Sequence, residues 1–140
     1  MAGDSLLTSG DTKLPERARK VFRLRDGRLF AASGDSENGL LLLDSLKRGE
    51  PTPQLEGVYA LLVHPDESLE YYEGRRWSRV RGSPFAAIGN GSSFALAAMT
   101  HGATAVEAVR VAMKLDTHSG GRVHSVTLKK KRKARGKSAR

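Results

Sequence analysis

The segment AAIGNGSSFALAAMTHGATAVEAV, residues 86–109, decides which fold this sequence can adopt. Its first three residues form a short apolar run, which is typical of a buried strand. The turn Gly89-Asn90-Gly91 ends that run. Ser92 or Ser93 can then cap a helix, because a serine hydroxyl accepts a hydrogen bond from the free N–H groups of the first turn. The segment thus opens with a strand, a Gly-X-Gly turn and the start of a helix.

Two short helices are predicted in tandem after this turn. Apolar residues within 94–99 keep helical spacing, and Gly102 ends the first helix. Thr104 and Glu107 form a capping box for the second helix. Its buried face is expected to consist of Ala105, Ala108, Val109, Ala112 and Leu115. Small residues dominate both inner faces, so the helices can pack closely against each other or against a sheet.

The remaining sequence predicts strands grouped into hairpins, with one further helix. The helix is capped by Asp35 or Ser36 and ended by Gly49. Around it we expect the end of a strand over 1–4, a polar loop over 5–16, strands over 20–24, 29–33, 58–63, 69–72 and 77–80, and a last strand over 123–128. Hairpins with grouped helices favour a layered α/β (α+β) fold with mostly antiparallel sheets over a wound βαβ fold.

Length and composition exclude several classes of protein. A chain of 140 residues is long enough for one domain with a real core, which we place at residues 1–128. There is no cysteine, and the four histidines show no metal-ligand spacing, so we expect neither disulfides nor a metal site nor a cofactor. No apolar run approaches ~18 residues, so no membrane contact is indicated and a cytoplasmic protein is the default expectation.

The formal net charge of +9 comes almost entirely from the last residues. Residues 129–140 hold eight of the 24 basic residues and no acidic residue, which leaves 16 basic against 15 acidic residues in 1–128. A block of like charges is expected to be disordered. It is either a solvated tail that aids solubility or a segment that contacts the phosphate backbone of a nucleic acid or another acidic partner.

Three motifs, in order, resemble the proteasome β-subunit/HslV family of N-terminal-nucleophile (Ntn) hydrolases. The first is Met1-Ala2-Gly3-Asp4, similar to the family's Ala-Gly-Asp, with Lys20 following Asp4 by 16 positions. The second is Ile88-Gly89-Asn90-Gly91, where the family has Gly-Ser-Gly before the same pair of helices. The third is Asp116-Thr117-His118-Ser119-Gly120, similar to the proteasomal D-x-x-S-G. Their order and intervals extend the resemblance over nearly the whole chain.

The resemblance implies a four-layer αββα sandwich and assigns a role to several residues. Asp4 and Lys20 would pair beside the nucleophile, and Asp116 and Ser119 would support it. The backbone N–H of Gly34 would line an oxyanion hole, and Asn90 and Gly91 would form the turn beside the site. It also implies a homo-oligomeric ring, an ATP-dependent unfoldase as partner and peptides as substrates.

The sequence departs from the family in its first strand, which carries the nucleophilic threonine. The chain begins where the second strand is expected, and no internal Gly-Thr bond offers self-processing. A second helix in the first helical layer is also missing, and Asn90 replaces the usual serine. Asp4, Lys20 and the other site residues would then be support residues only. We therefore expect the chain as written to lack peptidase activity.

Two functions from different classes stay open at this point. One is a threonine endopeptidase subunit whose nucleophile strand lies outside this sequence. The other is a non-catalytic protein of the same fold whose basic tail binds nucleic acid or another acidic partner. The coding sequence immediately upstream separates them, since an in-frame apolar strand beginning at a threonine supports the first, and a stop codon supports the second.

Overall fold

The computed structural model describes residues 1–9 and 11–129. Its elements, in chain order, are β1 (Ala2–Gly3), β2 (Leu6–Ser9), β3 (Thr12–Arg17), β4 (Val21–Arg23), β5 (Leu29–Gly34), α1 (Ser36–Arg48), β6 (Val58–Val63), β7 (Leu69–Glu73), β8 (Trp77–Arg79), α2 (Ser92–Thr100), α3 (Ala105–Leu115) and β9 (His124–Ser125). The tail that was predicted to be disordered spans residues 129–140, of which 130–140 lie outside the described residues.

A five-stranded antiparallel sheet in the order β4-β5-β6-β7-β8 forms the larger half of the molecule. Because side chains alternate across a strand, every second residue of a strand points toward α1. The register places Phe30 opposite Leu62, and Ala60 opposite Tyr72. These four side chains pack with Leu42 of α1 in one core cluster, where Leu42 is completely buried. Burying a leucine of this kind contributes roughly 1.5–3 kcal/mol.

The cap signals of the helices are confirmed at both ends of α1 and at the start of α3. The Asp35 carboxylate accepts a hydrogen bond from the Asn38 N–H at 2.9 Å, and Gly49 ends α1 in the left-handed conformation. Thr104 and Glu107 form the predicted capping box of α3. Local hydrogen-bonding chemistry was sufficient for these predictions, since the partners lie within three or four residues.

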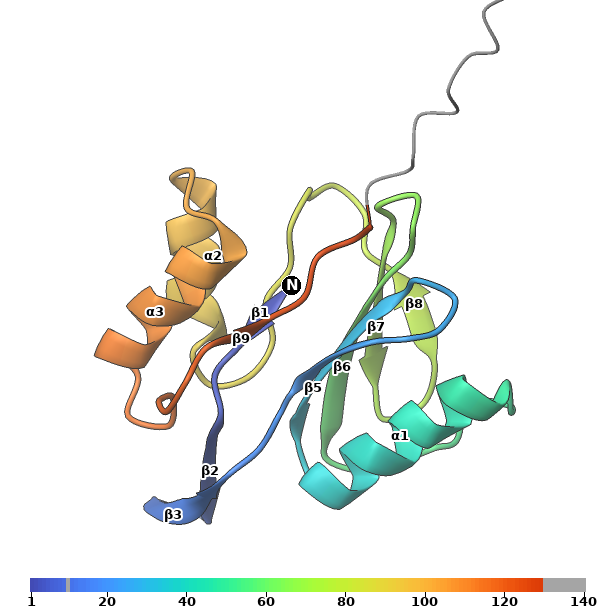
Figure 1. The fold of residues 1–140 in the computed structure, drawn as a ribbon, viewed down its shortest axis with the longest axis horizontal. Coiled ribbons are helices and arrows are strands. Elements are labelled where there is room, and N and C mark those ends of the chain that lie inside the picture. The colour runs from blue at the N-terminus through green and yellow to red at the C-terminus, as the bar shows by residue number, and fades with distance from the viewer. Residues whose placement is uncertain (10, 130–140) are drawn as a thin grey trace, which may run out of the picture.

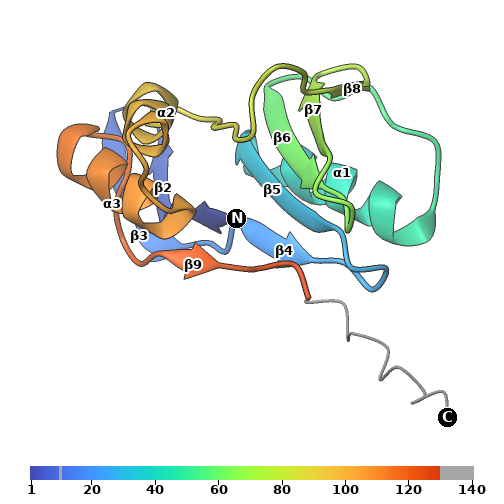
Figure 2. The ribbon, with the colours of Figure 1, turned by 90° about the horizontal axis from the view of Figure 1, so that it is seen from above.

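Helices α2 and α3 pack together through small side chains and form the second, smaller core cluster. Ala95, Ala108 and Ala112 are buried in it. Figure 1 shows this helix pair on the opposite side of the molecule from α1, with the strands between them, and Figure 2 shows the same arrangement from above. The prediction for the face of α3 was wrong at Leu115, which is 60% exposed because the helix ends there and turns away from the core.

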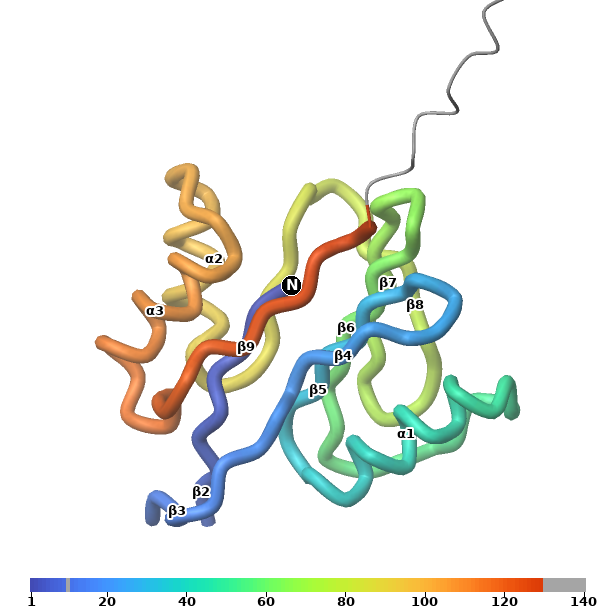
Figure 3. The backbone as a smooth tube through the Cα atoms, in the orientation of Figure 1, coloured from blue at the N-terminus to red at the C-terminus, as the bar shows by residue number. Residues whose placement is uncertain are grey.

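The two ends of the described chain lie side by side. Strand β1 pairs with β9 in antiparallel register, and Met1 exchanges backbone hydrogen bonds with Val126. Figure 3 shows the N-terminal segment running beside the C-terminal one. This two-stranded ladder lies next to α3, which contacts β1.

Several predicted elements differ from the structure. The polar loop expected over 5–16 is instead the hairpin β2–β3, with Leu6 buried beneath the Gly120 backbone, a contact that only the tertiary structure supplies. The strand expected over 86–88 forms no ladder, and the last strand is limited to β9. The α2 helix begins after Gly91 with no side-chain cap, so neither serine has the predicted role. No helix among the described residues is long and apolar enough to cross a membrane.

Candidate active site

Asp4 and Lys20 meet between the two halves of the fold. Asp4 directly follows β1, and Lys20 directly precedes β4. The Lys20 ammonium donates a hydrogen bond to Asp4 Oδ1 at 2.7 Å, and the Gly120 N–H donates one to Asp4 Oδ2 at 2.8 Å. The two side chains are 26% and 14% exposed. The predicted contact is therefore present, and it fixes a half-buried ammonium group by charge-assisted hydrogen bonding.

Asp116 and Ser119 form a second pair close to the first. Asp116 is the C-cap of α3, and the Ser119 hydroxyl donates a hydrogen bond to Asp116 Oδ2 at 2.6 Å. Gly120, which follows Ser119, is the residue whose N–H contacts Asp4. The two predicted pairs are thus joined through a single residue of the chain.

Gly91 allows the Gly-Asn-Gly turn to approach this second pair. A Cβ atom at position 91 would lie 2.9 Å from Ser119 Oγ and 2.9 Å from Ala112 Cβ, closer than side chains pack. A larger residue would therefore push the turn away from Ser119. The sequence motif contained this glycine, but the residues that require it, Ala112 and Ser119, lie more than 20 positions away.

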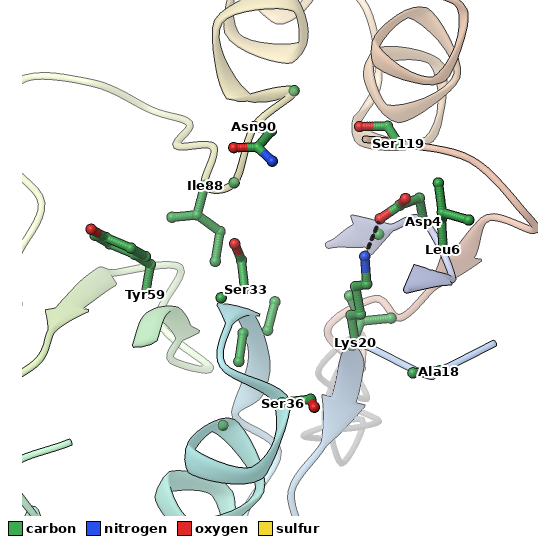
Figure 4. Close-up of a pocket in the computed structure, with 18 of the residues that line it drawn as sticks. Asp4, Leu6, Ala18, Lys20, Ser33, Ser36, Tyr59, Ile88, Asn90 and Ser119 are labelled. Carbon is green, nitrogen blue, oxygen red and sulfur yellow. Dashed lines mark hydrogen bonds and ion pairs between the residues drawn. The ribbon is translucent and has the colours of Figure 1, made fainter. Parts of the chain in front are cut away.

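A cavity of about 860 Å³ lies between the two halves and is lined by Asp4, Lys20 and Ser119. Gly34 at the end of β5 and Asn90 in the turn also line it. Figure 4 shows the Lys20–Asp4 pair and Ser119 on one side of the cavity, with Asn90, Ile88 and Tyr59 across from them. Six of the seven predicted site residues therefore line this cavity, and the seventh, Asp116, is joined to it through its hydrogen bond with Ser119.

Two titratable groups near the cavity have shifted pKa values. Burial lowers the pKa of the Met1 α-amine, which is held in the β1–β9 ladder by its hydrogen bond to the Val126 carbonyl. Burial, together with the negative charge of Glu73, raises the pKa of the Tyr71 hydroxyl on the cavity wall. Within residues 1–9 and 11–129, no cluster of three histidine, aspartate or glutamate side chains could hold a metal ion.

Sequence reasoning missed Ser5 and the backbone of Gly120. Ser5 is 1% exposed, and its hydroxyl oxygen accepts a hydrogen bond from the Arg122 N–H at 2.7 Å. Its position next to Asp4 was the only signal in the sequence, because the partners of its hydroxyl and its N–H, Arg122 and Gly120, lie more than 100 positions away.

Comparisons with known proteins place this arrangement in a known fold. A scan against protein-family models finds no match, and no curated protein matches the sequence. Solved structures do match. A structure of eukaryotic HslV from Trypanosoma brucei is 21% identical, with a TM-score of 0.72, and covers 88% of both chains. This chain has the fold of HslV.

A second protein with solved structures also matches this chain. A structure of BPH from Thiobacillus denitrificans is 21% identical with a TM-score of 0.68, and one of BPH in complex with epoxomicin is 23% identical with a TM-score of 0.65. Each covers 88% of both chains. The similarity to proteasome-like Ntn hydrolases predicted from the three motifs is confirmed at the level of the fold.

Proposed function

We propose that this chain is a subunit of a proteasome/HslV-like threonine peptidase and that the cavity beside Lys20 is its active site. The observation that carries the proposal is the 2.7 Å ion pair between Lys20 and Asp4, on the wall of a large cavity in an HslV-like fold. A lysine held in this way places a fixed positive charge where a hydroxyl nucleophile can be activated.

The proposed chemistry needs a threonine whose α-amine is free. Its hydroxyl attacks a peptide carbonyl, and its α-amine accepts the hydroxyl proton, since an α-amino pKa of about 7.7–8.0 lies near working pH. The α-amine then gives that proton to the leaving amine as the C–N bond breaks, and water hydrolyses the resulting ester to release the acyl group. The Lys20 ammonium favours the negative charge that develops on the attacking oxygen, and Asp4 orients it. The Gly34 N–H stabilises the oxyanion, and Asp116 and Ser119 support the geometry beside Gly91.

No threonine within the sequence can supply both groups, because an internal residue has no free α-amine. Thr8 lines the cavity but lies inside the β2–β3 hairpin. We therefore propose that the nucleophile belongs to an additional strand that begins with threonine and enters the cavity. Apolar side chains line much of the cavity, among them Leu6, Val21, Ala31, Ile88 and Val109, and they suit a strand of alternating polarity.

We propose the four-layer αββα arrangement for the complete site. The order in space that supports it is the α2–α3 pair, the β1–β9 ladder, the five-stranded sheet and α1. The additional strand would widen the small sheet and complete the second layer. A homo-oligomeric ring and an ATP-dependent unfoldase partner are proposals that depend on the same resemblance.

The experiment compares the 140-residue chain with a threonine-bearing form, in which an apolar strand and a turn precede Met1 and the first residue is a free threonine. We expect hydrolysis of fluorogenic peptides only by the threonine-bearing form. A matched control begins with alanine at the same position. Equal activity of the alanine control, or no activity of the threonine-bearing form when it is folded, would overturn the proposal and favour a non-catalytic protein of this fold.

A further inference from the structure

Ser5 is one of only two polar residues that are buried among those the structure describes. The other is Ser45, whose hydroxyl donates a hydrogen bond to the Leu42 carbonyl within its own helix at 2.7 Å. Ser5 instead bonds to residues far along the chain. A buried hydroxyl without a partner is costly, so a partner that the fold supplies from a distance indicates a specific role.

Three hydrogen bonds connect Ser5 to two other segments. Its N–H donates to the Gly120 carbonyl at 3.2 Å, and its hydroxyl oxygen accepts from the Arg122 N–H at 2.7 Å. Its carbonyl accepts from the Ala18 N–H at 3.0 Å, two residues before Lys20. Ser5 therefore touches the segment that carries Ser119 and the segment that carries Lys20, and it is covalently joined to Asp4.

The turn at Gly121 closes tightly over the Ser5 hydroxyl. Gly121 has φ +77°, and a Cβ atom there would overlap with Ser5 Oγ and lie 3.1 Å from Arg17 Cδ. Only glycine tolerates both this backbone conformation and this approach. The close contact shows that the hydroxyl and the 120–122 backbone are fitted to each other.

We infer that Ser5 is a positioning residue, whose hydroxyl locks the 119–122 turn onto Asp4 so that the Lys20–Asp4 pair and Ser119 keep a fixed relative geometry. The Gly120 N–H reaches Asp4 Oδ2 only while this turn stays in place. The hydrogen bond from the Arg122 N–H to the Ser5 hydroxyl oxygen fixes the other end of the turn. The catalytic meaning of this lock rests on the proposed function. The lock itself does not, because its parts are all present in the 140-residue chain.

The test uses Ser5→Ala, with Ser45→Ala as the matched control, in the 140-residue chain. Amide hydrogen exchange is followed by NMR at Gly120 and Arg122. We expect Ser5→Ala to speed exchange at both amides by about tenfold or more, the effect of losing a hydrogen bond that leaves a donor unpaired. It should also broaden the side-chain ammonium signal of Lys20. Ser45→Ala should change neither readout.

Two further measurements test the inference even if the Ser5→Ala variant does not fold. Ser5→Thr keeps the hydroxyl oxygen and should retain protection of the Arg122 amide. In the chain with Ser5 intact, the Arg122 amide should exchange at least about ten times more slowly than in an unfolded peptide. An unprotected Arg122 amide in the folded chain, or unchanged exchange and an unchanged Lys20 signal in folded Ser5→Ala, would overturn the inference.

The threonine-bearing form tests the catalytic meaning of the lock. There, Ser5→Ala should lower kcat about tenfold with KM unchanged, and Ser5→Thr should restore kcat, because the lock orients groups and does not bind substrate. A folded Ser5→Ala form with full kcat would overturn the positioning role. If the threonine-bearing form with Ser5 intact is inactive, the proposed function fails, while the exchange data still decide whether the lock exists.

Discussion

The Lys20 ammonium lies 2.7 Å from the Asp4 carboxylate, although a complete hairpin separates the two residues in the chain. The second oxygen of that carboxylate binds the Gly120 N–H, which is 116 positions from Asp4. The N-terminal strand, the segment before β4 and the turn after α3 therefore converge on one carboxylate. This convergence places the charge of Lys20 at the cavity wall.

Replacing Lys20 should remove the activity of the threonine-bearing form. Lys20→Ala eliminates the charge beside the nucleophile, and we expect kcat to fall by about 10²–10⁴. Lys20→Arg should fail as well, because the planar guanidinium is larger and differently shaped, so it cannot take the place of the compact ammonium group beside Asp4. Steady-state kinetics on a fluorogenic peptide measure both effects, with Lys47→Ala on α1 as the control. Full activity in Lys20→Ala would place the nucleophile elsewhere.

Gly34→Ala should destabilise the fold by more than backbone strain alone explains. Gly34 has φ +94°, and a Cβ atom there would overlap with the Gly57 carbonyl oxygen. Gly102 provides the matched control, because it has φ +95° and no atom within 4 Å of its Cβ position. We expect about 1 kcal/mol of destabilisation for Gly102→Ala and at least about 2 kcal/mol for Gly34→Ala.

Urea denaturation of the two variants measures this difference. Equal losses in the free energy of unfolding would show that the Gly57 carbonyl moves aside freely, and the tight approach of β5 to the 57–58 backbone would then have no energetic importance.

Gly91→Ala should separate the Gly-Asn-Gly turn from the Asp116–Ser119 pair. The added methyl group would lie 2.9 Å from Ser119 Oγ and 2.9 Å from Ala112 Cβ, so we expect a cost of roughly 1–3 kcal/mol from overpacking. Gly39→Ala in α1 is the contrasting change. Its methyl group would meet Ala32 Cβ at an ordinary 3.4 Å, and alanine favours a helix by roughly 0.5–1 kcal/mol. Thermal unfolding should therefore show a lower Tm for Gly91→Ala and a higher Tm for Gly39→Ala than for the unchanged chain.

The capping box of α3 should give a stability difference that depends on pH. The side-chain hydrogen bond with Thr104, followed by the one to its backbone, lowers the pKa of Glu107 from its usual 4.5. A lowered pKa in the folded state means that the charged carboxylate stabilises the fold above pH 4.5 and that this contribution disappears as the pH falls through the lowered value.

Thr104→Ala tests this cap. We expect a loss of about 1 kcal/mol at pH 7, typical of an N-cap threonine, and a smaller loss at pH 3, where Glu107 is increasingly protonated. The control is Thr100→Ala at the C-terminal end of α2, whose effect on stability should not depend on pH. Denaturation at the two pH values decides the matter, and a Thr104→Ala loss that is equal at both would contradict the role of the Glu107 charge.

The 140-residue chain should associate with itself. Residues 94–99 of helix α2 are all apolar, yet only Ala95 among them is buried, while Phe94 and Leu96 are exposed. A helix that exposes such an apolar stretch to water is expected to bind a partner surface. Sedimentation velocity should show a concentration-dependent increase in mass, and Leu96→Lys should reduce it, whereas Leu41→Lys on the far helix α1 should not. A monodisperse monomer over the whole range would contradict this.

The sequence by itself determined the elements whose signals are local. The stop at Gly49 and the capping box at Thr104 depend on partners within a few residues and formed as predicted, and Asp35, one of the two residues predicted to cap α1, has that role. Strands β5 and β6 likewise formed close to the ranges predicted for them, since a short run of strand-forming residues between turn residues is a local signal. The motif intervals predicted the Lys20–Asp4 contact because they followed a known pattern.

Only the tertiary structure decided the features that depend on distant partners. The polar stretch 5–16 became a hairpin because Leu6 is buried under Gly120. No described strand pairs with residues 86–88, and Ala87 and Ile88 line the cavity instead. Ser5 looks like an ordinary serine in the sequence, and its role follows from the Arg122 N–H, 117 positions away. Burial and long-range hydrogen bonds are set by which segments meet, and no local pattern contains that information.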